Sequence, residues 1–470
     1  MKTMYTLASV LFLFITNPTA KTSKDIRLDK KYKVESTFSG NTLGDDSFHL
    51  IIAKNTSSKA YDIIPYHYKN GETIQLKPVS FAKEPNVLSF HNNEGTLSLI
   101  TKSKEGKSEK IRVVDIDLAT GESKKSDSFS ADDFKAVIRE KDKNILLYAE
   151  KESIILVNAI GTESIETVEV KPSDGAQEFF KSLSNSNVDA INASEFVKNG
   201  SIKDFRAYFD GGVLTLTQED SKEGATSVVQ IPVVNNSKSM ANVETLKNTS
   251  LNGKIKKSTS YFSNDKLYQL KLKKDEAKLD IFDMSTVTKT TIDLLNEAFK
   301  NAVSDKNSAE KFIKNASKNA NAPTVTINKA AKGGAKVRFD YVNKNSYNYR
   351  YNWWWHHQWM MQQIMWQQQQ QMQMHMRASG FGPNVVEDVF FVKDEESHFE
   401  IGLDVNGNIT NPEDLETIHK DIDKKSYIND LDENKKYKHS STVFTDNNFR
   451  YIAYDKKSKT FVIIDKALND

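Results

Sequence analysis

The sequence predicts a mostly β fold, a β-propeller of six or seven blades with short helical insertions. Three observations predict it. Short runs of Leu, Ile, Val and Tyr alternate with polar residues, which is the pattern of a half-buried strand. Many of these runs come in pairs joined by polar turns containing Gly, Asn, Asp or Ser, as tight hairpins require. The paired unit recurs along the chain, which indicates a repeat architecture.

Seven copies of the two-strand unit can be recognised. The first three start 48 residues apart, which is the length of a four-stranded propeller blade, and insertions separate the later ones. The copies start at Phe48, Thr96, Asn144, Val213, Lys266, His398 and Phe449. A repeat that cannot bury its own apolar face must stack on its neighbours, and radial closure also protects the strand edges. We expect residues 30–470 to form the propeller body, with the run Tyr32–Phe38 pairing with the last blade.

In its spacing the repeat resembles secreted bacterial β-propeller repeat proteins. The sequence lacks the WD, kelch and Asp-box residues, so the resemblance points to no specific family. An open β-solenoid or two stacked sandwiches would use similar strands.

Helical spacing of apolar residues marks insertions in this pattern. Residues 175–200 and 290–318 carry such spacing and predict amphipathic helices, and Ala131–Arg139 predicts a short one. The stretch Lys314–Lys336 is rich in Asn, Lys, Ala and Gly and predicts a linker, with Gly333-Gly334 as a joint.

The first twenty residues predict a secretory signal peptide. Lys2 gives a positive start, Leu7–Ile15 is an apolar run too short to span a bilayer, and Ala20 is the candidate cleavage residue. No later run approaches the ~20 apolar residues that a membrane span needs. We therefore expect a secreted or periplasmic protein without a transmembrane segment after cleavage.

Composition excludes several classes of site. The chain has no Cys, so disulfides, thiolate nucleophiles and Cys-based metal sites are absent. Its formal charge is +2, and only 8 of its 65 basic residues are Arg, which argues against a nucleic-acid partner. The sequence contains no G-x-S-x-G, H-E-x-x-H, Walker or dinucleotide-binding motif, so we expect no enzyme. An enzyme with a pocket on the ring axis stays open as an alternative, because propeller sites are assembled from scattered loops without a local motif.

The other polar motifs have structural explanations. Asp404–Asn408 begins like a calcium loop, but Leu415 stands where the loop needs Glu, so a hairpin turn is expected. The pairs Asp115/Asp117 and Asp421/Asp423 could bind a cation, but nothing nearby completes a site. The isolated histidines show no metal-ligand spacing and are expected in packing or on the surface: His49, His67, His91, His398, His419 and His439.

The segment 347–380 is the exception to this ordinary composition. All five Trp of the chain lie in it, with six of the ten Met and three of the nine His. We predict a low-complexity insertion between two strands of the repeat, because excursions of this length are functional or disordered. The tryptophans form the expected interaction patch, namely Trp353, Trp354, Trp355, Trp359 and Trp366.

Four interpretations of the segment compete. The first is a low-complexity loop whose composition has drifted without a function, and the second is a contact surface for a protein or membrane. The third is a metal site, and the fourth is a platform on which sugar rings stack. Thioether and imidazole ligands suit Cu(I). Cu(I) is therefore the cofactor of the metal interpretation, and under the other interpretations we expect no cofactor. Its candidate ligands are Met372, Met374, His375, Met376, His356 and His357. The sequence thus predicts an exported, non-enzymatic binding or scaffold protein that contacts a protein or cell-envelope component through this segment or through the propeller loops. A periplasmic protein that binds copper or senses metal through the Met/His cluster is the alternative.

Overall fold

The fold is described by a computed structural model, which covers residues 21–140, 142–191, 200–221, 223–233, 239–241, 243–247, 255–274, 276–296, 306–318, 321–343, 398–419, 422, 427–428, 431 and 434–468. The chain divides into two compact units. Unit 1 comprises residues 1–84 and 424–470, and unit 2 comprises residues 85–423. Among the described residues, no helix combines the length and apolar character needed to cross a membrane.

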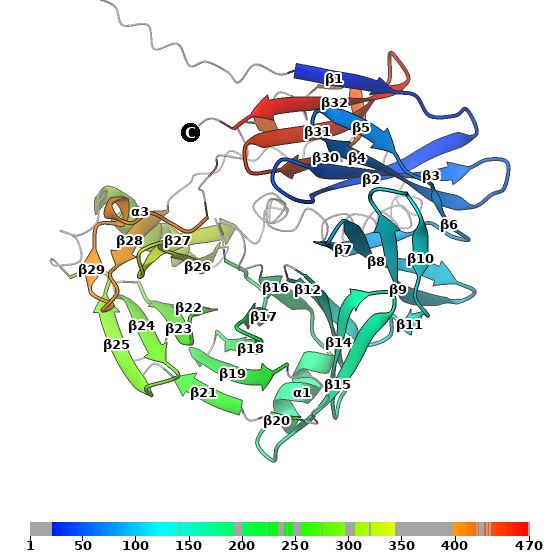
Figure 1. The fold of residues 1–470 in the computed structure, drawn as a ribbon. Coiled ribbons are helices and arrows are strands. Elements are labelled where there is room, and N and C mark those ends of the chain that lie inside the picture. Colours follow the sequence, from blue (N-terminus) through cyan, green and yellow to red (C-terminus); the bar gives the residue numbers. More distant parts are fainter. Residues whose placement is uncertain are drawn as a thin grey trace, which may run out of the picture. The chain divides into compact units, whose positions relative to one another are not determined.

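The described strands form seven sheets of four or five strands (Figure 1). Neighbouring strands in these sheets are antiparallel except for β15–β20 and β16–β17, which are parallel. Sheets of this kind, stacked through their first strands, are the blades of a β-propeller. We number the blades 1 to 7 in chain order, and the protein is a mostly β, seven-bladed propeller chain.

Unit 1 holds blades 1 and 7. Blade 1 contains β2 (Tyr32–Asn41), β3 (Ser47–Asn55), β4 (Tyr61–Lys69) and β5 (Glu72–Gln75), and β6 (Val79–Phe81) also pairs with β4. Blade 7 contains β30 (Tyr437–Phe444), β31 (Asn448–Asp455), β32 (Thr460–Ala467) and β1 (Lys21–Ile26).

Unit 2 holds blades 2 to 6. Blade 2 contains β7 (Asn86–Asn93), β8 (Thr96–Glu105), β9 (Ser108–Asp117), β10 (Ser123–Lys125) and β11 (Phe129–Ser130). Blade 3 contains β12 (Phe134–Arg139), β13 (Asn144–Ala149), β14 (Ile154–Gly161), β15 (Ser164–Pro172) and β20 (Ser239–Ala241). Blade 4 contains β16 (Val188–Ile191), β17 (Phe205–Asp210), β18 (Val213–Asp220), β19 (Ala225–Pro232) and β21 (Val243–Lys247).

The last two blades of unit 2 have four strands each. Blade 5 contains β22 (Lys257–Ser263), β23 (Lys266–Leu272), β24 (Ala277–Asp283) and β25 (Thr288–Asp293). Blade 6 contains β26 (Asn321–Lys329), β27 (Ala335–Asn343), β28 (Phe399–Leu403) and β29 (Ile409–Thr410), followed by the 3-10 turn η3 (Pro412–Asp414).

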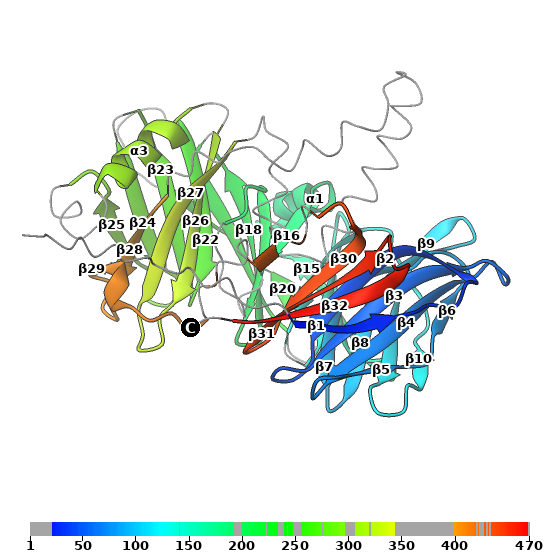
Figure 2. The ribbon, with the colours of Figure 1, turned by 90° about the horizontal axis from the view of Figure 1, so that it is seen from above.

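The two chain ends build blade 7 together. Strand β1 pairs antiparallel with β32, with Ile26 opposite Phe461, and Figure 2 shows β1 beside β32. The sequence predicted that Tyr32–Phe38 would make this pairing, and that prediction is wrong. These residues belong to β2, which pairs with β3 in blade 1. Strand β2 nevertheless meets blade 7 through side chains, since Thr37 Oγ1 donates to the His439 carbonyl at 2.9 Å and Ser39 and Ser441 share a 2.7 Å hydrogen bond.

The repeat predicted from the sequence is confirmed by the strand order. Five of the seven predicted copies are the second and third strands of their blades, and the copies at Val213 and His398 are the third and fourth strands of blades 4 and 6. These central strands read as repeats because they are buried on both faces. In blade 3, for example, every residue of β13 is buried. Burial of their aliphatic side chains is the main source of stability for the fold.

The helical predictions are correct only in part. Helix α1 (Gln177–Ser184) lies in the expected insertion 175–200, and α3 (Lys306–Ala316) lies in 290–318. Val188–Ile191, however, is strand β16, which pairs in parallel with β17 and is buried along its length. Ala131–Arg139 contains strand β12, and the predicted linker 314–336 contains strand β26. In the first two segments sheet pairing overrides the local helical spacing, and in the third it orders a stretch whose composition suggested a linker.

Gly333 and Gly334 form a tight turn between β26 and β27. Both have positive φ, +89° and +82°, which residues with a side chain adopt at a cost. A Cβ on Gly334 would lie 2.2 Å from the Leu403 carbonyl oxygen. The turn is therefore a constrained hairpin rather than the flexible joint predicted from the composition.

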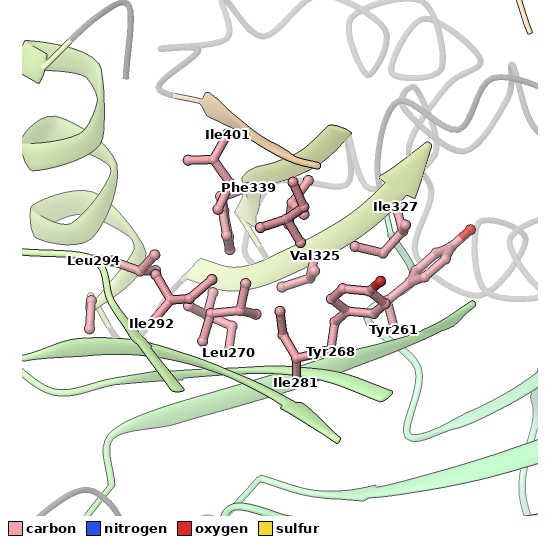
Figure 3. Close-up of a cluster of buried hydrophobic side chains, with 14 of the residues drawn as sticks. Tyr261, Tyr268, Leu270, Ile281, Ile292, Leu294, Val325, Ile327, Phe339 and Ile401 are labelled. Carbon is pink, nitrogen blue, oxygen red and sulfur yellow. The ribbon is translucent and has the colours of Figure 1, made fainter. Parts of the chain in front are cut away.

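The largest apolar core of unit 2 is shared by blades 4, 5 and 6 (Figure 3). Leu270 of blade 5 and Phe339 of blade 6 are completely buried in it. Helix α3 closes this core with Phe312, which is also completely buried. The core fixes the strand ends of three consecutive blades, on which the pocket described below is built.

Candidate functional site

The residues that the sequence marked for function lie outside the described residues. This holds for the five tryptophans of the predicted interaction patch, for the six candidate copper ligands, and for the signal segment 1–20. Within the described part of the chain, His, Asp and Glu residues form no cluster of three or more suited to a metal ion. What the structure does describe is where the Trp-rich insertion begins and ends.

The insertion interrupts a continuous sheet. Strands β27 and β28 are neighbours in blade 6, with Phe339 opposite Phe399 and Val337 opposite Ile401. The chain leaves β27 after Asn343 and returns at β28 with Phe399. Residues 344–398 are therefore an excursion between two paired strands of one blade, as the sequence predicted for the segment 347–380.

Aromatic packing holds the two strands together where the excursion begins. The rings of Phe339 and Phe399 are stacked with centroids 4.6 Å apart, and Phe312 of α3 meets Phe399 edge to face at 5.3 Å. We call these three residues the blade 6 junction. Aromatic pairs of this kind add about 0.5–1.5 kcal/mol beyond their burial.

An arginine network fixes the opposite face of the same strands. Arg338 of β27 donates from Nε to Asp340 Oδ2 at 2.8 Å and from Nη1 to Glu400 Oε1 of β28 at 2.9 Å. Burial would lower the pKa of Arg338, but the two carboxylates raise it above its ordinary value. The guanidinium stays charged and ties β27 to β28 beside the insertion.

A pocket opens at the other end of these strands. It lies where β17 of blade 4, β22 of blade 5 and β26 of blade 6 end in their hairpin turns, and we call it the hairpin-end pocket. Its lining includes Tyr208, Phe209, Asp210, Tyr261, Phe262, Ser263, Asn264, Ile327, Asn328, Lys329 and His419. Lys329 ends β26 at the turn, whereas Asn343 ends β27 at the opposite end, so pocket and insertion lie at opposite ends of blade 6.

The floor of the pocket is aromatic. The rings of Tyr208 and Tyr261 meet edge to face at 5.3 Å, and Phe262 lies 6.0 Å from Tyr208. Figure 3 shows Tyr261 beside Ile327, with its hydroxyl turned away from the aliphatic side chains of the core. Burial raises the pKa of both tyrosines, so they are neutral hydroxyls at physiological pH.

The rim of the pocket is charged but balanced. Asp210 Oδ2 and Lys329 Nζ form an ion pair at 2.6 Å between blades 4 and 6, and their side chains are 56% and 29% exposed. Glu140, in the hairpin turn of blade 3, is close enough for Asp210 to act on it. Burial raises the pKa of Glu140 to about 7, Lys143 lowers it, and Asp142 and Asp210 raise it.

A buried polar seam lies between blades 4 and 5. Arg206 and Glu219 of blade 4 form an ion pair there, and Ser260 of blade 5 donates to Glu219 Oε2 at 2.7 Å. Lys271 of blade 5 is completely buried, and its ammonium has no hydrogen-bond partner in the described structure. Burial lowers the pKa of Lys271 to about 8, although Asp280 and Glu219 act in the opposite direction.

The aspartate motifs considered as cation sites have structural roles wherever they lie among the described residues. Asp404 Oδ1 accepts from the Asn406 and Asn408 amides at 2.9 and 2.8 Å, which makes the β28–β29 hairpin turn that was expected instead of a calcium loop. Asp117 accepts from the Ala119 and Thr120 amides in a turn. Asp421 and Asp423 lie outside the described residues.

Asp115 and two histidines also serve packing. Asp115 accepts from the Thr162 amide at 2.7 Å and so joins blades 2 and 3. His91 is completely buried, and its Nε2 lies 2.8 Å from the Ile160 carbonyl. His49 is completely buried between two serines, and burial lowers its pKa to about 3, with Arg450 acting in the same direction. Both imidazoles are therefore interior hydrogen-bonding groups.

Sequence reasoning missed the hairpin-end pocket because its residues come from three blades. Asp210, Ser263 and Lys329 are 53 and 66 positions apart, and nothing local links them. One signal could have found them, since each is the last residue of a strand that runs through a tight hairpin into the next strand of its blade. Aligning the repeats on these hairpins would have placed the three at one end.

Comparison with known proteins gives similar structures but no family. No family model matches the sequence, and no curated protein does. The propeller domain of the trilobed protease from Pyrococcus furiosus superposes with a TM-score of 0.33 at 11% identity, over 94% of this chain and 97% of that one. The WD40 domain of SCAP from fission yeast gives 0.28 at 7%, covering 94% and 99%, and prolyl oligopeptidase B from Galerina marginata gives 0.33 at 9%, covering 96% and 52%. Superpositions this weak carry no argument about activity, and the chain's assignment as a seven-bladed propeller follows from its own strand pairing.

Proposed function

We propose that this chain is an exported, non-enzymatic binding or scaffold protein that contacts a protein or cell-envelope component through its Trp-rich insertion. One observation carries the proposal. Blade 6 keeps its strand register and its aromatic junction although 55 residues separate its second and third strands. The propeller therefore does not need the insertion to complete its sheet, and a segment of this length is retained for another purpose.

The composition of the insertion supports a contact role. Trp and Met are favoured at protein interfaces, where Trp supplies large contact areas and Met adapts its shape. The insertion carries all of the Trp and more than half of the Met of the chain. Its two ends are held by the blade 6 junction and by the Arg338 network, so a partner bound to the insertion is tethered to blade 6.

The test compares two variants of equal length. In one, the five tryptophans Trp353, Trp354, Trp355, Trp359 and Trp366 become Ser, and in the matched control the five residues Gln367–Gln371 become Ser. Each protein is used to capture partners and membranes from the producing cell. We expect the tryptophan variant to lose its partners and the glutamine variant to keep them. Equal capture by both variants would rule out the tryptophan patch as the contact surface.

Copper binding through the Met/His cluster is the second candidate function, favoured by the M-x-M-H-M sequence at 372–376. It is tested by titrating the protein with Cu(I) against a competing chelator. Replacing Met372, Met374, His375 and Met376 by Ala should abolish binding, whereas replacing Met360 and Met361 should not. A wild-type protein that fails to compete with the chelator would end this candidate.

A further inference from the structure

We infer that one end of unit 1 binds an anionic lipid surface through a repeated group of lysines. The inference does not depend on the proposed role of the Trp-rich insertion, which belongs to the sequence of unit 2. It follows from the tetrapeptide Lys-Lys-Tyr-Lys, which stands at the start of the first strands of blades 1 and 7, and from the turns beside it.

The tetrapeptide occupies equivalent places in the two blades. It stands at residues 30–33 and again at 435–438, and its tyrosine is the first residue of β2 and of β30. In both copies the carbonyl of the second lysine accepts a backbone hydrogen bond from the hairpin turn that follows the next strand. The donors are the amides of Thr56 at 2.8 Å and Lys456 at 3.0 Å. The same sequence therefore makes the same backbone contact twice.

Each of these hairpin turns places a further lysine in an unfavourable backbone conformation. Lys59 and Lys459 have φ of +65° and +59°, and their amides donate to the carbonyl four residues earlier at 2.8 and 2.9 Å. A turn of the same geometry in blade 2 has Gly121 at this position. A residue with a side chain adopts this conformation at a cost, so the turn itself does not explain the lysine.

The lysines of the two blades lie on one surface, because β2 and β30 are neighbours. Thr37 of β2 donates to the His439 carbonyl of β30 at 2.9 Å. Burial lowers the pKa of His439, Lys438 and Lys33 lower it further, and Glu35 acts in the opposite direction. Lysines of both blades thus act on one imidazole. We call this surface the lysine end and define it as residues 30–33, 55–60, 435–438 and 455–460.

Positive charge is in large excess on the lysine end. All ten of its lysines are exposed, and its acidic residue, Asp455, is buried. Seven of the lysines form no ion pair among the described residues. The other three form the pairs Lys31–Asp29, Lys33–Glu35 and Lys436–Asp455.

The opposite end of the same two blades has the opposite charge. The turn between β2 and β3 carries Asp45 and Asp46, and the turn between β30 and β31 carries Asp446. Neither turn contains Lys or Arg. Since the whole chain carries a formal charge of only +2, the lysines of unit 1 are sorted to one end rather than merely abundant.

An anionic lipid surface is the partner that this chemistry favours. A cluster of lysines is attracted to the negative surface potential of anionic lipids. The ten basic residues include no Arg, the residue suited to gripping one phosphate, so a surface with many phosphates fits better than a single group. Tyr32 and Tyr437 lie half-buried among the lysines, with Lys31 and Lys436 Nζ 5.3 and 5.5 Å from their ring centroids. Tyr is favoured at the depth of lipid headgroups.

The experiment measures how the full chain sediments with lipid vesicles. One set of vesicles is phosphatidylcholine alone, and the other is phosphatidylcholine mixed with phosphatidylglycerol. We expect the protein to bind the mixed vesicles, to ignore the neutral ones, and to be released by salt, because salt screens exposed charges. Equal binding to both sets, or binding to neither, would overturn the inference.

Charge-removing variants locate the binding. Each lysine near an anionic surface contributes about fivefold in affinity. Replacing Lys30, Lys435, Lys438 and Lys457 by Gln should therefore weaken vesicle binding by more than about a hundredfold. The matched control replaces four exposed lysines of unit 2 by Gln, namely Lys104, Lys107, Lys151 and Lys332. The control should bind as the wild type does, and equal losses in both variants would refute the lysine end as the site.

The turn lysines separate binding from a structural role. Replacing Lys59 and Lys459 by Gly relieves the backbone strain, so this variant should melt at a higher temperature than the wild type. It should also bind the mixed vesicles about twentyfold more weakly, because two positive charges are lost. A variant that melts earlier, or that binds as tightly as the wild type, would contradict the role assigned to these lysines.

Two further comparisons exclude other sources of binding. Tighter binding to duplex DNA than to the mixed vesicles at equal phosphate concentration would assign the lysine end to nucleic acid and overturn the lipid inference. The chain with Ser in place of its five tryptophans should keep its salt-sensitive binding to the mixed vesicles. The variant with Gln at Lys30, Lys435, Lys438 and Lys457 should keep the protein partners of the insertion, so the two proposals can fail separately.

Discussion

Arg206 and Glu219 form a buried ion pair on paired strands of blade 4, with Nη1 of the guanidinium 3.4 Å from Oε2 of the carboxylate. The pair also reaches blade 5, because Arg206 donates to Thr259 Oγ1 at 3.3 Å and Glu219 accepts from Ser258 and Ser260. Two neighbouring blades are thus joined by buried charge as well as by apolar packing.

Removing either member of this pair should destabilise the protein strongly. Arg206→Met or Glu219→Gln leaves a buried group unpaired, and we expect a loss of about 3–5 kcal/mol in the free energy of unfolding measured in urea. The control is Glu163→Gln in the exposed pair with Lys124, whose side chains are 79% and 70% exposed and which should contribute at most about 1 kcal/mol. Similar losses in both pairs would contradict the role assigned to the buried one.

Lys271 should make the stability depend on alkaline pH. Its folded pKa is about 8, below its ordinary value, so the unfolded chain binds more protons at pH values between the two. The free energy of unfolding therefore rises as the pH increases from about 8 toward the ordinary pKa of Lys. This gain in stability is lost again as the pH falls to the folded pKa of about 8. The full contribution is at most about 3 kcal/mol, at 1.36 kcal/mol for each pKa unit.

The measurement is urea denaturation between pH 7 and pH 10. Lys271→Met should remove most of the rise and should stabilise the protein at pH 7, because it replaces an unpaired buried amine by an apolar side chain of similar length. Lys278→Met on the neighbouring strand β24 is the control, since its side chain is only partly buried. A wild-type profile that is flat over this range would show that Lys271 does not titrate as described.

Gly334 should tolerate no side chain, and Gly95 provides the comparison. Both have positive φ, +82° and +86°, but a Cβ at Gly95 meets nothing within 4 Å. We expect Gly95→Ala to cost about 1–2 kcal/mol from backbone strain alone. Gly334→Ala should cost clearly more, because its Cβ collides with the Leu403 carbonyl. Equal melting temperatures for the two variants would show that the turn can relax.

The blade 6 junction should stabilise the propeller whether or not the insertion is intact. Phe339→Ala removes a completely buried ring stacked on Phe399 and should cost about 3–5 kcal/mol. The loss should be the same in a chain whose residues 347–380 are replaced by a Gly/Ser linker. A smaller loss in the linker chain would mean that the insertion itself packs on the junction.

The sequence predicted the second and third strands of the blades well, because these strands are buried on both faces and read as apolar runs. It failed at Val188–Ile191, where apolar spacing suggested a helix but the backbone pairs in parallel with β17. The sequence also predicted that Tyr32–Phe38 would pair with the last blade, whereas β1 pairs with β32 there. The residues of β1, KTSKDI at 21–26, were missed because few of them are apolar. The first pairing is set by a strand 17 residues further along the chain and the second by a strand more than four hundred residues away.

The two candidate sites also differ in how far the sequence could predict them. The Trp-rich insertion was visible from composition, and its position between two strands followed from the aromatic and aliphatic runs on either side. The hairpin-end pocket was not visible, because Tyr208, Asp210 and Lys329 are ordinary residues in their local context. They become a site only when three blades stack.

The pairing of Ile26 with Phe461 has a consequence for how the protein matures. These two residues are 435 positions apart, so β1 is synthesised long before its partner β32 and stays unpaired while the blades between them are made. Blade 7 cannot be assembled before β32 has been made, and exposed strand edges invite wrong pairing in the meantime. Chaperones that hold nascent chains should therefore act on the first strand rather than on the later blades.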